Sequence, residues 1–141
     1  METNNDSHKG LFGLIGIEYE EVGPDRCVLT LDVDERHLQP YGLVHGGIYC
    51  LLAETAASVG AAVYAMEHDM AGAVGVSNST DFYRPMRQGT IRAVATPIHR
   101  GRSQQVWQVE MSDPAEDRLV SRSQVRLHNL TDSAVVGGTS G

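Results

Sequence analysis

The segment from residue 46 to residue 66 is predicted to form one long helix in which Glu54 is the only charged residue. Its length is close to that needed to cross a bilayer. Its many alanines and glycines, with polar Glu54 and Ser58 in mid-span, instead favour a buried helix of a soluble domain. Because a carboxylate inside an apolar helix costs on the order of several kcal/mol unless it is paired, hydrogen-bonded or protonated, Glu54 needs a structural or chemical reason.

Strand patterns flank this helix on both sides. Runs of apolar and β-branched residues are separated by turn sequences such as Gly23-Pro24-Asp25. Two strands, one long helix and four strands predict an α+β fold in which an antiparallel sheet wraps around a central helix. The expected strands are residues 14–22, 27–33, 73–83, 90–99, 104–112 and 119–127. Six small residues would let the helix approach the sheet closely, namely Ala53, Ala56, Ala57, Gly60, Ala61 and Ala62.

The length allows one domain, which we expect to span residues 1–130. The chain has 141 residues, enough for one hydrophobic core and too few for two. Residues 131–141 are rich in Gly, Ser and Thr and predict a disordered tail. Cys27 and Cys50 have neither CxxC spacing nor a secretory context, so we expect two free, buried thiols.

Charge and N-terminal composition limit the expected partners and location. The formal net charge is −7, and the eleven Lys and Arg residues are scattered, so the basic stripe of a nucleic-acid-binding protein is missing. Residues 1–9 are polar and acidic and lack the basic start and apolar run of a signal peptide. We therefore expect a cytoplasmic protein that binds neither nucleic acid nor a membrane.

Polar features at two places on the long helix suggest chemistry. Ser58 follows Glu54 by four residues, so its hydroxyl can orient the carboxylate or a shared water, or it can bond back to the Glu54 carbonyl. Gly46 and Gly47 can present unobstructed N–H groups at the helix N-terminus, where the dipole favours an oxyanion. A glycine pair at a helix start is also common as simple turn chemistry.

Helix geometry separates these two features. The nine residues from His45 to Glu54 make about two and a half turns and about 13 Å of rise, which places Glu54 far along the helix on roughly the opposite face. One helix therefore cannot bring Glu54 and Gly46 to the same substrate. If both act together, an antiparallel helix of a second subunit must supply Glu54, which predicts a two-fold homodimer with two shared sites.

A longer motif around these residues resembles a known family. Residues 39–47 read Gln-Pro-Tyr-Gly-Leu-Val-His-Gly-Gly, and Leu52-Ala53-Glu54 and Ser58 follow. This pattern resembles the active-site segment of hotdog-fold acyl-CoA thioesterases, and the likeness runs from about Leu11 to Leu127. It is similar to branches of the family that act on 1,4-dihydroxy-2-naphthoyl-CoA, proofread enterobactin synthesis or act on 4-hydroxybenzoyl-CoA.

The resemblance implies a hotdog fold and a role for each matching residue. Glu54 would be the nucleophile or the general base for water, and the Gly46 N–H would bind the thioester oxygen. His45 would support that end of the helix, Gln39 would position the carbonyl or water, and Ser58 would hold the water or Glu54. Taken singly, His45 can also be a plain helix cap and Gln39 a plain loop residue. The resemblance implies no metal and no other cofactor.

Substrate binding and assembly are also implied by the resemblance. Arg84, Arg102, Ser103 and Phe82 would bind the acyl-CoA, and dimers would pair into a homotetramer. Phe82 replaces a histidine of the naphthoyl-CoA and enterobactin branches, whereas Ser58 differs from the threonine of the hydroxybenzoyl-CoA branch. We expect an aromatic acyl-CoA. An aliphatic acyl-CoA and a non-catalytic acyl-CoA-binding module are the alternatives, and the Asp and His pair of hotdog dehydratases is not found in the sequence.

Overall fold

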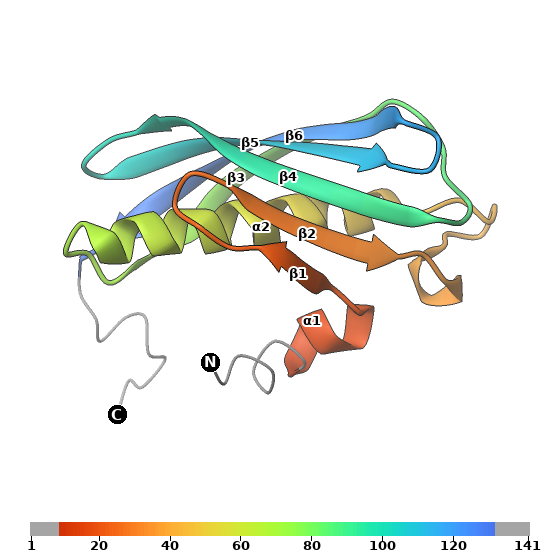
Figure 1. Ribbon diagram of the computed structural model, residues 1–141, viewed down its shortest axis with the longest axis horizontal. Coiled ribbons are helices and arrows are strands. Elements are labelled where there is room, and N and C mark those ends of the chain that lie inside the picture. The colour runs from red at the N-terminus through yellow and green to blue at the C-terminus, as the bar shows by residue number, and fades with distance from the viewer. Residues whose placement is uncertain (1–8, 132–141) are drawn as a thin grey trace.

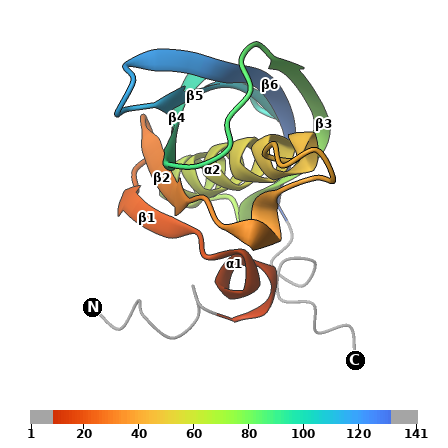
Figure 2. The ribbon, with the colours of Figure 1, turned by 90° about the vertical axis from the view of Figure 1, so that its right-hand side faces the viewer.

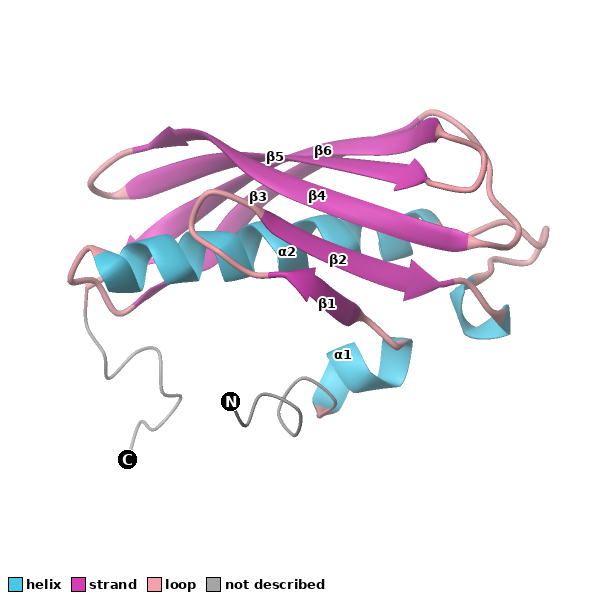
Figure 3. Ribbon diagram, viewed as in Figure 1, coloured by secondary structure: helices cyan, strands magenta, loops and turns pink. Residues whose placement is uncertain are grey.

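An antiparallel sheet wraps around one long helix in the computed structural model, which describes residues 9–131 (Figure 1). The strand order is β1-β2-β4-β5-β6-β3, so β3 forms one edge of the six-stranded sheet. The predicted α+β hotdog architecture is confirmed. The elements are α1 (Gly10–Ile15), β1 (Glu18–Glu21), β2 (Cys27–Asp32), the 3-10 turn η1 (Glu35–His37), α2 (Gly46–Glu67), β3 (Gly72–Phe82), β4 (Thr90–Arg100), β5 (Gln104–Asp113) and β6 (Arg118–Leu130) (Figure 3).

Small residues bring α2 close to the concave face of the sheet, as predicted. Figure 2, which looks along the helix, shows the sheet curving around it. A Cβ added at Gly60 would lie only 2.6 Å from the ring of Trp107, the largest buried side chain of β5. Five alanines of α2 have no exposed surface, namely Ala53, Ala56, Ala57, Ala61 and Ala65. The helix is long and apolar enough to span a membrane by length and composition alone, but this packing explains its composition.

The N-terminal region differs from the expectation. Residues 10–15 form α1, which was not predicted, and the first strand begins at Glu18 rather than at residue 14. Gly16 ends α1 with a φ of 90°, and its N–H donates to the Phe12 carbonyl. This left-handed cap stops the apolar run from continuing as a strand.

The two cysteines differ in burial. Cys27 and Cys50 are both free, as predicted. Cys27 is buried, and burial raises the pKa of its thiol to about 11, whereas Cys50 is only half-buried. Residues 132–141 of the predicted tail lie outside the described part of the chain.

Candidate functional site

The N-terminus of α2 presents a backbone donor without an acceptor. His45 caps the helix, because its Nδ1 accepts a hydrogen bond of 2.8 Å from the Gly47 N–H. The neutral ring therefore carries its proton on Nε2. Within residues 9–131, the Gly46 N–H makes no hydrogen bond. It lies at the positive end of a 22-residue helix, where it can donate to a developing oxyanion.

Backbone hydrogen bonds hold this helix end in place. The His45 N–H donates to the His37 carbonyl at 2.8 Å, and the Val44 N–H donates to the Met86 carbonyl at 2.8 Å. The His37 side chain is fully buried, and its Nε2 donates to the Ile15 carbonyl at 2.7 Å. The loop before α2 is thus anchored both to α1 and to the segment after β3, which fixes where the helix begins.

Gly46 opens into a hollow of about 330 Å³ that also contains three predicted site residues, Gln39, Phe82 and Arg84. A Cβ at Gly46 would lie 2.8 Å from Cζ of Phe82, so the ring lies directly against the helix start. The lining residues are Gln39, Leu43, Val44, Gly46, Tyr49, Phe82, Tyr83, Arg84 and Pro85. The structure therefore brings the predicted oxyanion donor, the loop glutamine and one predicted CoA-binding arginine together.

Glu54 lies in a different hollow, of about 350 Å³, between α1, α2 and β3. Its lining residues are Leu11, Phe12, Leu51, Glu54, Thr55, Ser58, Val59, Ala73, Val74 and Gly75. The expectation of a carboxylate in an apolar interior is wrong for the single chain, in which Glu54 is exposed. The reason is that Glu54 lies beside β3, the edge strand, beyond which the sheet of its own chain has no further described strand.

Ser58 lies in the same hollow as Glu54 and is half-buried. Among the described residues, its hydroxyl makes no hydrogen bond to the Glu54 carbonyl. The neighbouring hydroxyl does bond back along the helix, since Thr55 Oγ1 donates to the Leu51 carbonyl at 2.7 Å. The Ser58 hydroxyl therefore stays available beside the carboxylate.

The two hollows share none of their lining residues. Gly46 and Glu54 are thus separate within one chain, as the helical spacing predicted. Arg102 and Ser103 belong to neither hollow. They lie in the turn between β4 and β5, at the opposite end of the molecule from Gly46 (Figure 1). One chain alone does not assemble the complete set of predicted residues.

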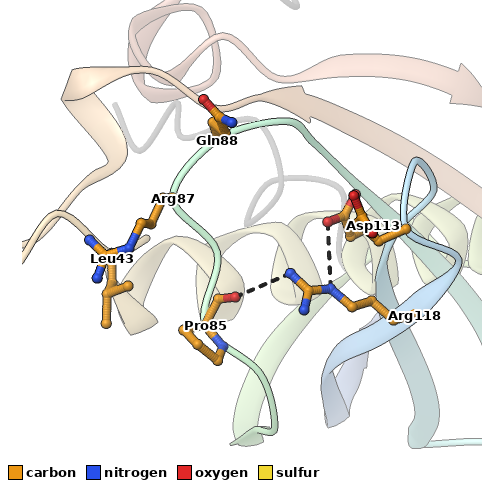
Figure 4. A pocket seen from close by; sticks show the side chains of 7 residues that line it. Leu43, Pro85, Arg87, Gln88, Asp113 and Arg118 are labelled. Atoms are coloured by element: carbon orange, nitrogen blue, oxygen red, sulfur yellow. Dashed lines mark hydrogen bonds and ion pairs between the residues drawn. The ribbon is translucent and has the colours of Figure 1, made fainter.

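A third hollow, of about 420 Å³, adjoins the Gly46 hollow at Leu43 and Pro85 (Figure 4). Arg118 Nε lies 3.6 Å from Asp113 Oδ2 in its wall. The buried Tyr49 hydroxyl, Asp113 Oδ1 and Arg118 Nε make no hydrogen bond to any described residue. Burial raises the pKa of Tyr49 to about 12, against a smaller lowering by the Arg118 charge, so the phenol stays neutral. This hollow contains an ion pair, but Gly46 with its free N–H does not line it. We therefore do not assign the reaction to this hollow.

Sequence reasoning missed three contributors to these hollows. Tyr49 lies one turn after Gly46 on the same face of α2, a spacing that could have revealed it. Phe12 lines the Glu54 hollow from α1, a helix that was not predicted. Gly75 lies against Glu54 from β3, and a strand glycine gives no such signal before the strand is placed.

Comparison with known proteins gives consistent matches. The family model described as thioesterase superfamily matches residues 41–120. The Mycobacterium tuberculosis protein Rv1847 is 45% identical over 82% of this chain and 83% of its own length. The solved structure of that protein superposes with a TM-score of 0.81 and covers 85% of this chain and 95% of that one. The 1,4-dihydroxy-2-naphthoyl-CoA hydrolase of Escherichia coli is 38% identical over 80% of this chain and 82% of its own. The structure of thioesterase HI1161 from Haemophilus influenzae has a TM-score of 0.83 at 34% identity, covering 91% of this chain and 87% of that one.

Proposed function

The chain belongs to the thioesterase superfamily, and we propose on that premise that it hydrolyses an aromatic acyl-CoA at sites built jointly by two copies of the chain. Its class of activity, thioester hydrolysis, follows from the family. The observation that carries the proposal is the free Gly46 N–H in one hollow and the Glu54 carboxylate in another. Each is half of the machinery that acyl transfer needs.

The edge strand β3 supports the two-copy arrangement. It pairs with β6 on one side only, and Val74 and Val76 are about half exposed, at 44% and 51%. An uncovered apolar strand edge favours pairing with another chain. We propose that two copies meet along β3 around a two-fold axis, so that each copy contributes the same surface.

The contacts between β3 and α2 support the proposal that such an axis completes the site. Phe82 lies against Gly46, the Asn78 side chain donates to the Cys50 carbonyl, and Gly75 lies against Glu54. The strand therefore runs antiparallel to the helix, with Asn78 midway between the two ends. A two-fold axis near this midpoint exchanges the ends and brings Glu54 of the second copy toward Gly46 of the first.

In this arrangement each residue has its own role in the reaction. The Gly46 N–H binds the thioester oxygen, and Gln39 holds the carbonyl or the water. Glu54 of the second copy attacks the carbonyl carbon or takes a proton from the attacking water, with Ser58 beside it. The carbon–sulfur bond breaks, CoA leaves as its thiol, and one water is consumed for each acid released. Arg84 would bind the CoA phosphates near Gly46, and Arg102 and Ser103 would do so from the turn after β4.

Aromatic and apolar lining residues favour an aromatic acyl group. Tyr49, Phe82 and Tyr83 line the Gly46 hollow, and Phe12 and Val59 line the Glu54 hollow. Such surfaces bind a flat apolar ring by burial and by ring packing. The similarity to a hydrolase named for a naphthoyl-CoA supports the same choice.

Activity against a panel of acyl-CoA esters tests this function. We expect benzoyl-, hydroxybenzoyl- and dihydroxynaphthoyl-CoA to be hydrolysed with a kcat/KM at least about tenfold above that of aliphatic esters. The release of free CoA thiol measures the rate. A higher kcat/KM for aliphatic esters would instead identify an aliphatic acyl-CoA as the substrate. Tight binding of every ester without thiol release would identify a non-catalytic acyl-CoA-binding module.

The proposal includes the location and the assembly of the protein. We place the enzyme in the cytoplasm, with residues 1–130 as one domain and with two dimers paired into a homotetramer. Sedimentation of the purified chain tests the assembly. A mass of four chains is expected, whereas a fully active single chain would contradict the shared site.

A further inference from the structure

Gly75 of β3 lies directly against the Glu54 carboxylate. A Cβ added at Gly75 would lie 2.5 Å from Glu54 Oε1 and 3.3 Å from Cδ. The backbone itself does not require glycine there, since its φ is outside the left-handed region. Glycine is therefore explained at this position by the close approach of the Glu54 carboxylate and not by a special backbone conformation.

The strand is not free to withdraw from the helix. Asn78 Nδ2 donates to the Cys50 carbonyl at 3.0 Å, and this carbonyl is also the helical acceptor of the Glu54 N–H. On its other side, β3 pairs with β6 from Gly72 to Phe82, with a register shift between Gly75 and Ser77. Because the strand is tied on both sides, an added methyl group would displace the flexible Glu54 side chain instead.

We propose that Gly75 is a positioning residue, which keeps the Glu54 carboxylate against β3 in the place required for attack on the thioester. This inference rests on the proposed function, because it gives Gly75 a role only if Glu54 performs the chemistry. A glycine at this point of the edge strand thus serves the reaction and not the fold.

Gly75→Ala in the full chain tests the proposal, with the best ester of the panel as substrate. We expect kcat to fall by about 100-fold, because a displacement near 1 Å costs about that much, with KM within about twofold of the wild-type value. The thermal midpoint should not fall. Gly23→Ala is the matched control, since its added Cβ meets only an ordinary contact of 3.5 Å with the Arg26 carbonyl. This control should keep the wild-type kcat.

A double variant separates positioning from a general disturbance of β3. Aspartate is one methylene shorter than glutamate, so its carboxylate clears the added methyl group. Glu54→Asp should therefore reduce kcat much less in the Gly75→Ala background than in the wild-type background. Equal reductions in both backgrounds would overturn the proposal.

The single variants distinguish a failure of the Gly75 positioning role from a failure of the proposed thioesterase function. Wild-type kcat in Gly75→Ala, together with an inactive Glu54→Gln, would overturn the positioning role and leave the thioesterase mechanism in place. An active Glu54→Gln would remove the proposed role of Glu54 itself. A kcat that falls in Gly75→Ala only in proportion to a loss of folded protein would also overturn the proposal.

Discussion

We expect the replacement of Glu54 with glutamine to lower kcat for acyl-CoA hydrolysis by at least about 1,000-fold. Glutamine has nearly the shape of glutamate but neither attacks a carbonyl nor accepts a proton from water. Steady-state thiol release measures the change. Glu67→Gln is the matched control, because Glu67 is an exposed glutamate at the last position of the same helix. It should leave kcat unchanged.

We expect the same Glu54 variant to have little effect on stability. Glu54 is exposed in the single chain, so we expect the free energy of unfolding to change by less than about 0.5 kcal/mol. A near wild-type kcat in Glu54→Gln would show that another group performs the attack.

We expect the replacement of Gly46 with proline to lower kcat by about 100-fold to 1,000-fold, because proline lacks the N–H proposed to bind the thioester oxygen. Proline is well tolerated at the first position of a helix, so the fold should survive. Gly46→Ala is the matched control. Both variants carry a Cβ where the Phe82 ring lies at 2.8 Å, but only alanine keeps the donor.

The comparison of the two Gly46 variants isolates the hydrogen bond from the displacement of Phe82. We expect the alanine variant to retain at least about tenfold more activity than the proline variant. Equal losses in both variants would mean that the ring position, and not the N–H, controls the rate.

Much of the fold could be predicted from the sequence because α2 and the long strands have strong patterns. The helix was expected over residues 46–66 and is found at Gly46–Glu67. The small α1 was missed because its apolar residues also suit a strand, and the left-handed cap at Gly16 decides the outcome. The resemblance to hotdog thioesterases is confirmed by the family match over residues 41–120.

The candidate site was only partly predictable. The separation of Gly46 from Glu54 followed from helical spacing alone, and the two separate hollows agree with it. The exposure of Glu54 did not follow, because it depends on which face of α2 the sheet leaves uncovered. The contact between Gly75 and Glu54 joins residues that are 21 positions apart, and only the placed strand reveals it.

Two inactive variants, produced together, test most directly the claim that two chains share each site. A Glu54→Gln chain still supplies the Gly46 N–H, and a Gly46→Pro chain still supplies the Glu54 carboxylate. Equal co-expression gives mixed dimers in about half of the population, each with one intact site of two. We therefore expect about one quarter of the wild-type activity from the mixture. Activity no higher than that of the separate variants, with mixed dimers detected by mass spectrometry, would contradict the shared site.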